Sequence, residues 1–158
     1  MARPWILDYD SANCTIGATV GILGERPTFL VLREAFNGVR RFDDMQRRTG
    51  KPRQVLSQRL SRLVDEGLLR KVPYQEAGQR PRSEYRLTEK GLDLWPVLVS
   101  LLRWGDKWMT GRKGPPVELH HRACGHAIHP ELACPECGDW LMATDMKATL
   151  RRSPTRTS

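Results

Sequence analysis

Residues 51–71, KPRQVLSQRLSRLVDEGLLRK, constrain the fold of this chain more than any other stretch. Leu56, Leu60 and Leu63 recur at helical spacing, which predicts a helix with one face buried in a core. The opposite face carries polar and basic side chains: Arg53, Gln54, Ser57, Gln58, Arg59, Ser61 and Arg62. Residues 51–64 contain no carboxylate, whereas a merely solvated helix would mix Glu with Lys. This face therefore has the composition of a surface that meets an anionic partner.

Net charge is concentrated in one third of the sequence. The 158 residues include 26 Lys and Arg against 18 Asp and Glu, which gives a formal net charge of +8. Between Arg40 and Lys90 there are fourteen basic and seven acidic residues, so this segment holds +7 of the +8. A concentration of this kind indicates a binding site for a polyanion.

The length of the chain and its hydrophobic content of 39% allow one small globular core with an appendage. No stretch of about 18 apolar residues is present, as a membrane span would require. Asp8 and Asp10 also interrupt the N-terminal segment that a signal peptide would need. We therefore expect a soluble, cytoplasmic protein that does not contact a membrane.

Periodicity and capping residues predict the order of the elements. Helices are expected at about 14–23, 27–36, 42–49 and 52–66, with Asn13 capping the first. Two strands, at about 68–75 and 83–88, are joined by the polar stretch EAGQRPR. A last helix is expected from Thr88 to about Met109, with a bend or a restart at Pro96.

The last helix is apolar on two sides. One side holds Leu94, Val97, Leu101 and Trp104, and the other holds Leu92, Trp95, Leu98, Leu102 and Trp108. A helix that is apolar on two sides needs two partners. We expect one partner to be the protein's own core and the other to be a second subunit.

Composition divides the chain into four segments. Residues 1–110 are expected to form the globular domain, and residues 111–117, which include GRKGPP, a linker. Residues 118–142 form a small segment rich in His and Cys. Residues 143–158, which end in RRSPTRTS, are expected to be a disordered basic tail.

Several segments between Asn13 and Met109 together resemble one known family. They are the Asn13-Cys14 pair, LREAFNGVRRFDDMQ, VLSQRLSRLVDEGLLRK, RSEYRLTEKG and LWPVLVSLLRWGDKW. On these segments the sequence resembles the HxlR-type regulators, relatives of the MarR group. The resemblance implies a mainly α (α+β) fold: a winged helix-turn-helix with a two-stranded wing and a long C-terminal dimerisation helix. Pro27 stands where the family often has Trp, so the start of the second helix is expected to pack differently.

The resemblance also implies a function. It implies a transcriptional regulator, a repressor, that binds double-stranded DNA specifically and acts as a homodimer on an inverted repeat; no effector is identified. The helix at 52–66 would enter the major groove, where Gln and Arg can pair with base edges, and the hairpin loop would lie near the minor groove. The implied DNA contacts are Arg53, Gln54, Ser57, Gln58 and Arg59 in the helix, and Arg80 and Arg82 in the wing.

Two other classes of function compete with DNA binding. An enzyme would need more than the paired acids Asp43 and Asp44, because no Gly-rich phosphate loop or Ser/His/Asp arrangement accompanies them. We therefore expect no catalytic residues. The alternative is an RNA-binding or partner-binding basic zinc-ribbon module without operator specificity. Single-stranded RNA is read by stacking on aromatic side chains, and the basic region offers few of them, with Tyr74 and Tyr85 in the predicted strands.

The segment HHRACGHAIHPELACPECGDW, residues 120–140, predicts a metal site. It contains two half-motifs: His121-x-x-Cys124-Gly125-His126 and Cys134-x-x-Cys137-Gly138-Asp139. A ligand pair at this spacing followed by glycine is typical of a zinc-ribbon knuckle. We predict one structural zinc ion held by His121, Cys124, Cys134 and Cys137, with His126 the main competitor for the fourth position and His120 and His129 behind it. The alternative is three reduced cysteines in an unstructured tail.

Cys14 stands apart from the other three cysteines in the sequence. One interpretation is a small, buried apolar residue. The other is a redox-sensor thiol, because a helix N-terminus favours the thiolate form. Some members of the resembled family respond to oxidants or electrophiles through a cysteine at this place.

Overall fold

The structure is a computed structural model that describes residues 11–149 except Gln79 and His129. Residues 1–10, with Asp8 and Asp10, and the basic end 150–158 lie outside the described residues. The helices are α1 (Thr15–Leu23), α2 (Arg26–Phe36), α3 (Phe42–Thr49), α4 (Arg53–Asp65), α5 (Glu89–Leu92) and α6 (Trp95–Met109). The strands are β1 (Leu69–Tyr74) and β2 (Arg82–Leu87), and short 3-10 turns occupy Ser11–Asn13, Gly111–Lys113 and Ala143–Asp145. Among the described residues, no helix is long and apolar enough to cross a membrane.

The element order agrees with the sequence prediction, and the structure differs from it at the start of α1 and in the last predicted helix. Cys14, not Asn13, caps α1, because Asn13 belongs to the preceding 3-10 turn and the Cys14 Sγ accepts a hydrogen bond from the Gly17 N–H at 3.4 Å. The expected last helix is two helices. Thr88 caps α5, and the chain restarts as α6 with Pro96 near its N-terminus, which is the restart that proline predicts.

A single core lies where α2, α3, α4 and the start of β1 meet. Its fully buried apolar side chains include Val31, Leu32, Met45, Leu56, Leu60, Leu63 and Leu69. The leucine face predicted for residues 51–71 is therefore the core face of α4. Gly50, between α3 and α4, adopts a left-handed φ of 63°, and this conformation makes the sharp turn between the two helices.

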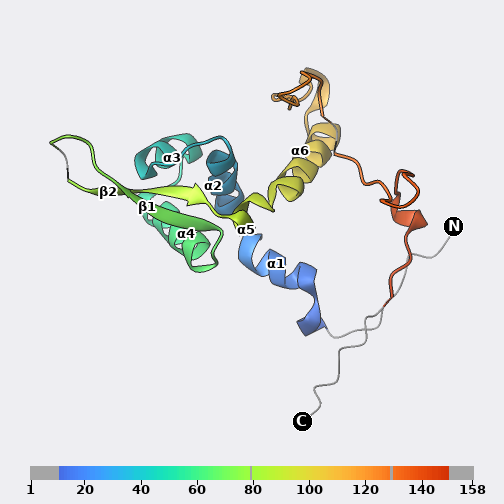
Figure 1. Ribbon diagram of the computed structural model, residues 1–158, viewed down its shortest axis with the longest axis horizontal. Helices are drawn as coiled ribbons and strands as arrows, with labels where there is room; N and C mark the ends of the chain where they lie inside the picture. Colours follow the sequence, from blue (N-terminus) through green and yellow to red (C-terminus); the bar gives the residue numbers. More distant parts are fainter. Residues whose placement is uncertain (1–10, 79, 129, 150–158) are drawn as a thin grey trace, which may run out of the picture.

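The wing is an antiparallel hairpin that projects from this core (Figure 1). Its register runs from Leu69 opposite Leu87 to Tyr74 opposite Arg82. The segment before α3 extends the sheet, because Arg41 forms a bridge with Glu84 and the Tyr85 N–H donates to the Arg40 carbonyl at 2.8 Å. The fold is thus mainly helical with a two-stranded sheet, the winged helix-turn-helix that was predicted.

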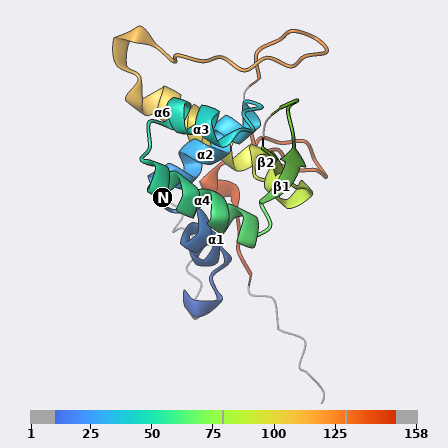
Figure 2. The same ribbon diagram turned by 90° about the vertical axis from the view of Figure 1, so that its left-hand side faces the viewer.

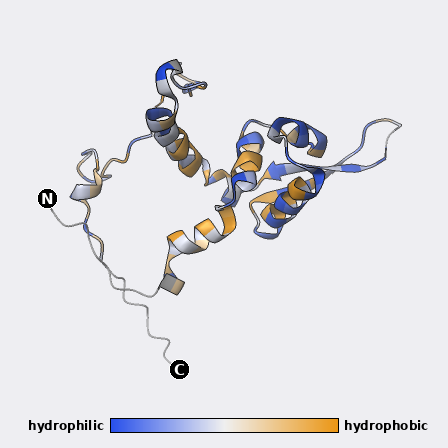
Figure 3. Cartoon of the chain, turned by 180° about the vertical axis from the view of Figure 1, so that it is seen from behind, coloured by the Kyte–Doolittle hydropathy of each residue, from blue (hydrophilic) through white to orange (hydrophobic). Residues whose placement is uncertain are grey.

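The helices α1 and α6 extend from the body formed by α2, α3, α4 and the wing (Figures 1 and 2). Both contain hydrophobic residues (Figure 3), and several of their large apolar side chains are exposed in the described structure. On α6 the structure regroups the two predicted sides. Leu94, Leu98, Val99 and Leu102 are buried or half-buried, whereas Val97, Leu101, Trp104 and Trp108 are exposed.

Candidate nucleic-acid interface and metal ligands

The exposed face of α4 carries most of the residues for which DNA contact was predicted. Arg53, Gln54, Ser57 and Gln58 all expose their side chains in the first two turns of the helix. Leu56 and Leu60 hold the opposite face in the core, so the exposed face has a fixed orientation. Gln and Arg side chains at the N-terminal end of a docked helix can reach base edges in a major groove.

Asp43, in the first turn of α3, lies between α4 and the wing. Its two carboxylate oxygens face Arg53 Nη1 at 3.9 Å and Arg82 Nη1 at 3.7 Å. The Arg53 guanidinium also lies over the Phe42 ring, 4.8 Å from its centroid. In the sequence, Asp43 stands out only as one of two paired acids, because contacts between distant segments depend on the tertiary fold. The pairing brings two predicted DNA contacts, one from α4 and one from β2, to the same place.

The wing loop, residues 75–81, carries the other predicted contact. Arg80 is exposed in this loop, and Arg82 begins β2 with its side chain in solvent. Arg41 holds the base of the loop, since its Nη2 lies 2.5 Å from Glu76 Oε1 and its guanidinium covers the Tyr74 ring at 4.8 Å. The basic wing is therefore held next to the exposed face of α4.

Arg59 is the predicted contact that the structure places elsewhere. Its side chain is 18% exposed and forms an ion pair with Glu25, the residue before α2. One turn further, Arg62 Nη2 donates to the Gly21 carbonyl at 2.6 Å. Position 59 flanks the buried leucines, so its guanidinium is directed toward the α1–α2 junction. DNA contact by Arg59 remains a prediction and would require it to leave Glu25.

A second basic surface lies between α2, α3 and the wing. A hollow of about 430 Å³ is lined by Asn37, Gly38, Val39, Arg40, Arg41, Asp44, Arg47, Arg48 and Glu84. Four of these residues are arginines, and they lie beside the wing rather than on α4. Arg40 and Arg41 precede α3 and Arg47 and Arg48 lie near its end, so their charges could be counted in the sequence but their common surface depends on the fold.

Glu34 lies buried beneath this basic surface. Its Oε1 accepts from Arg33 and its Oε2 from Arg48 Nε at 2.5 Å, which ties α2 to α3. Burial raises the pKa of Glu34, but the hydrogen bonds from Arg48 and Arg33 outweigh it, and the pKa lies below its ordinary value of 4.5. Glu34 is therefore an ionised, structural carboxylate between the two helices.

The two half-motifs of the tail form two hairpins of the same geometry. In the first hairpin, the His121 N–H donates to the His126 carbonyl, the Gly125 N–H to the His121 carbonyl, and the Ile128 N–H to the Leu119 carbonyl, at 2.7–2.9 Å. The second hairpin repeats these three bonds thirteen residues later: Cys134 to Asp139, Gly138 to Cys134, and Leu141 to Leu132. Gly125 and Gly138 both have positive φ, 74° and 79°. The half-motifs are therefore two copies of one knuckle.

Each knuckle brings its own pair of predicted ligands together. In the first hairpin, His121 Nδ1 and Cys124 Sγ lie 3.2 Å apart. In the second, hydrogen bonds from the backbone of Cys137 and Glu136, and then from the Cys137 side chain, lower the pKa of Cys134. Backbone donors of this kind favour a thiolate, the form that binds zinc.

The structure does not bring the two knuckles to each other. Within the described part of the chain, no three His, Cys, Asp or Glu side chains are grouped as a metal ion would require. The predicted set of His121, Cys124, Cys134 and Cys137 is thus present as two separate pairs. His126 and His120 belong to the first hairpin, where His120 Nδ1 lies 3.0 Å from the Gly125 carbonyl.

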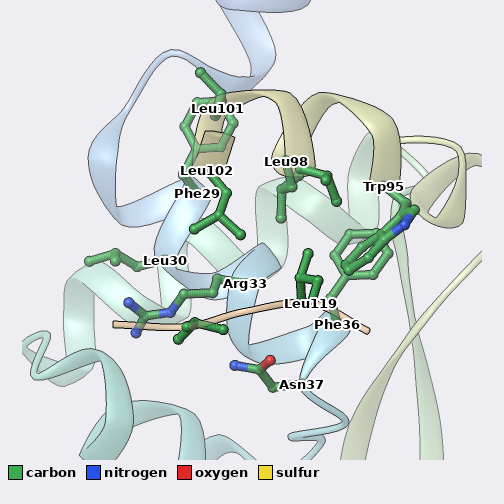
Figure 4. A pocket seen from close by; sticks show the side chains of 12 residues that line it. Phe29, Leu30, Arg33, Phe36, Asn37, Trp95, Leu98, Leu101, Leu102 and Leu119 are labelled. Atoms are coloured by element: carbon green, nitrogen blue, oxygen red, sulfur yellow. The ribbon is translucent and has the colours of Figure 1, made fainter. Parts of the chain in front are cut away.

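The first hairpin is docked on the body of the protein. A hollow of about 360 Å³ lies between α2 and α6, and Figure 4 shows Phe29, Phe36, Trp95 and Leu98 around it. Leu119, which leads into the first hairpin, lies on the same hollow. The tail therefore begins as part of the apolar packing of α2 and α6.

Three comparisons with known proteins agree with this geometry. Residues 22–113 match the HxlR-like helix-turn-helix family. The HTH-type transcriptional regulator Mb3122 of Mycobacterium bovis is 45% identical over 132 residues, which cover 84% of this chain and 82% of the relative.

Two solved structures extend the similarity beyond the helix-turn-helix region. PA1607, described as a transcription factor, has a TM-score of 0.78 and 31% identity, and covers 88% of this chain and 96% of its own. PA1374 of Pseudomonas aeruginosa, described in the same way, has a TM-score of 0.60 and 29% identity, and covers 91% and 95%. The chain belongs to the HxlR-like helix-turn-helix family.

Proposed function

We propose that the protein is a transcriptional regulator, a repressor, that binds an inverted repeat in double-stranded DNA as a homodimer. The observation that carries the proposal is the exposed face of α4, where Gln54, Ser57 and Gln58 lie beside Arg53 and the wing residue Arg82. Gln side chains can discriminate bases in the major groove, and arginines can position the protein on phosphates. The similarity to named transcriptional regulators supports this role.

A homodimer is supported by the apolar surface of α1 and α6. Ile16 and Val20 of α1 and Leu101 and Trp104 of α6 are at least half exposed. A hollow of about 350 Å³ between the two helices is lined by Ile16 and Val20 of α1 and by Val97 and Leu101 of α6, together with neighbouring residues. A surface of this kind on a small protein marks an interface. A second copy of the chain would cover it and set the spacing of two α4 helices on one face of DNA.

Repression follows from the geometry of such binding. Two wings and two α4 helices would occupy about one turn of the duplex at each half-site, and this excludes polymerase from an overlapping promoter. The residues proposed to contact DNA are Arg53, Gln54, Ser57 and Gln58 of α4 and Arg80 and Arg82 of the wing. Arg59 joins them only in a bound state in which its pair with Glu25 is broken.

Genome-wide footprinting with the purified full-length protein tests the proposal. We expect protected inverted repeats whose half-sites are about one helical turn apart. Affinity should fall on the order of a thousandfold between 50 and 200 mM salt, because each dimer neutralises several phosphates. Equal affinity for a duplex and for a single-stranded RNA of the same charge would favour an RNA-binding module instead. A chain that stays monomeric at micromolar concentration would also contradict the proposal.

A structural zinc ion in the tail is part of the proposal. Its ligands are His121, Cys124, Cys134 and Cys137, which the structure presents as two knuckles of identical hydrogen bonding. The zinc would supply folding energy to a segment that has little apolar mass of its own. Metal analysis of the purified protein should find about one zinc ion per chain.

Cys14 is proposed as a thiol that tunes DNA binding. It is half-buried and caps α1, one of the two helices of the proposed dimer interface. Oxidation or alkylation there would disturb the start of α1 and hence the spacing of the two α4 helices. A mild electrophile should weaken DNA binding by the wild type and leave Cys14→Ser unaffected. An equal response of the two proteins would make Cys14 a structural residue only.

A further inference from the structure

Each knuckle of the tail supplies half of a zinc site. A structural zinc ion takes four ligands in a tetrahedron, and one knuckle offers two. The first knuckle holds His121 and Cys124 with their ligand atoms 3.2 Å apart, and the second holds Cys134 and Cys137. In the described residues of one chain the two halves do not form a group. A complete site needs one ligand pair from each of two knuckles, and these knuckles can belong to one chain or to two.

Contacts with α6 hold Pro130 and Glu131, which lie between the two knuckles. Arg103 Nη1 donates to the Pro130 carbonyl at 2.9 Å, and its Nη2 donates to Glu131 Oε1 at 3.2 Å. Leu119 and Ile128, at the base of the first knuckle, line a hollow against the same helix. The first knuckle is therefore docked on its own chain, and the chain then leads the second knuckle away from it (Figures 1 and 2).

The second knuckle presents apolar side chains that the described residues of its own chain leave exposed. Leu132 is 75% exposed and Trp140 is 66% exposed, and Met142 beside them is also exposed. We call residues 130–142, which carry the second knuckle, the arm. Exposure of this apolar cluster to water is unfavourable, since burial of each large apolar side chain contributes about 1.5–3 kcal/mol. We therefore expect another molecule to cover the apolar side chains of the arm.

The similarity to a solved structure extends beyond the winged helix. PA1607 covers 88% of the chain, a share that residues 11–113 cannot supply. The family match, by contrast, ends at residue 113. Residues outside the winged helix are therefore part of the similarity to PA1607.

We infer that the zinc site is built across the dimer: the first knuckle of one copy and the second knuckle of the other copy bind one zinc ion. The inference rests on the proposed homodimer. By two-fold symmetry the exchange occurs twice, so that the arm of each chain contacts the other chain. His121 and Cys124 come from the chain on which the first knuckle is docked, and Cys134 and Cys137 arrive on the arm of the other chain.

The exchanged arrangement is favoured over pairing of like knuckles. If each knuckle paired with its own copy, both zinc ions would have to lie on the two-fold axis, with the first and the second knuckle each meeting their own copies there. An exchanged site can lie anywhere off the axis. It also places Leu132 and Trp140 of the arm against the partner, next to the apolar surface of α6.

Mixed dimers distinguish the arrangements. The first-knuckle variant is His121→Ala with Cys124→Ser, and the second-knuckle variant is Cys134→Ser with Cys137→Ser. The two full-length chains are co-expressed with different affinity tags, and dimers that carry both tags are isolated. Zinc is then measured per dimer by elemental analysis, with the wild type treated in the same way.

Among the variant dimers, the exchanged site predicts zinc only in the mixed dimer. Each variant alone should bind no zinc, and the mixed dimer should hold about one ion, because one intact knuckle from each chain can meet. A site within one chain predicts no zinc in the mixed dimer. Pairing of like knuckles predicts zinc in each variant alone. Either of these two results would overturn the inference.

Two controls keep the result interpretable. Single substitutions, Cys124→Ser in one chain and Cys134→Ser in the other, repeat the experiment with a smaller change if a double variant is poorly folded. Light scattering of the wild type separates failure of the dimer from failure of the exchange. A monomeric wild type would refute the proposed homodimer and the exchange with it, whereas a dimer with zinc-free mixed species would refute the exchange alone.

Discussion

The winged helix and the tail of this protein are stabilised in opposite ways. In the winged helix, the leucines of α4 are fully buried against α2, α3 and β1. In the tail, Leu132, Trp140 and Met142 remain exposed, and the regular structure among the described residues of 118–142 is two short hairpins. The first region contains its own hydrophobic core. The second region packs on the body through Leu119 and Ile128 at the base of the first knuckle and leaves the apolar side chains of the second knuckle exposed. We therefore expect the second region to depend on the proposed zinc ion and on the proposed second subunit.

Removal of zinc should separate the two regions most strongly. A structural zinc ion contributes about 10 kcal/mol to the folding of a small domain, and the tail has little else. We expect a chelator to abolish amide protection in residues 118–142 while residues 26–87 keep theirs, as measured by hydrogen exchange. The first-knuckle variant serves as the control, because it should show the exposed tail before chelation. Loss of protection in α4 on chelation would show that the two regions are not independent.

A cavity in the core should have the converse effect. Leu60 is fully buried, so Leu60→Ala should reduce the free energy of unfolding by about 2–5 kcal/mol in urea denaturation. The matched change is Leu132→Ala, at a position that is largely exposed. In zinc-free protein it should alter the free energy of unfolding by less than about 0.5 kcal/mol. Equal effects would mean that the arm packs on its own winged helix.

Within the winged helix, substitutions on α4 and substitutions in the wing should have different effects on DNA binding. Gln58→Ala should cost about 1–3 kcal/mol on the specific site and little on other DNA, because it removes a base contact. Arg82→Ala should weaken binding to all sequences alike and lower the slope of affinity against salt by about one phosphate. Competition titrations with specific and random duplexes measure both. If both variants lose the two kinds of binding equally, the assignment of the α4 face is wrong.

The sequence predicted the winged helix well because local and tertiary signals coincide there. Leu56, Leu60 and Leu63 repeat at helical spacing and are all buried. Pro96 predicted the break between α5 and α6. The leucines that give the sequence signal are also the residues that form the core.

The remaining features depend on contacts between distant segments. Arg59 has the composition of a DNA contact, but Glu25, thirty-four residues earlier, holds it. Asp43 is an acidic residue in the first turn of α3, yet it lies between Arg53 and Arg82. The knuckles were recognised from their spacing, whereas their separation follows from Arg103, which binds the segment between them. Periodicity contains no information about such pairs.

The smallest effect is expected for Glu34, which links α2 to α3. Glu34→Gln removes a buried charge that accepts from Arg33 and Arg48. Both arginines are about half exposed, so solvent screens the interaction, and we expect a loss of only about 1 kcal/mol in the free energy of unfolding at pH 7. Asp44→Asn removes a surface pair with Arg47 and is the matched control, with a change of less than about 0.5 kcal/mol.

The dependence of this loss on pH identifies its cause. The pKa of Glu34 is lower in the folded protein than its ordinary value of 4.5, so ionised Glu34 stabilises the fold above that pH. As the pH falls below 4.5 and through the lowered pKa, the carboxylate is protonated and its contribution disappears. The difference between the wild type and Glu34→Gln should therefore be full at pH 7 and should shrink at pH 3, as measured by urea denaturation at each pH. A difference that is constant across this range would mean that Glu34 stabilises the junction of α2 and α3 by packing rather than by charge.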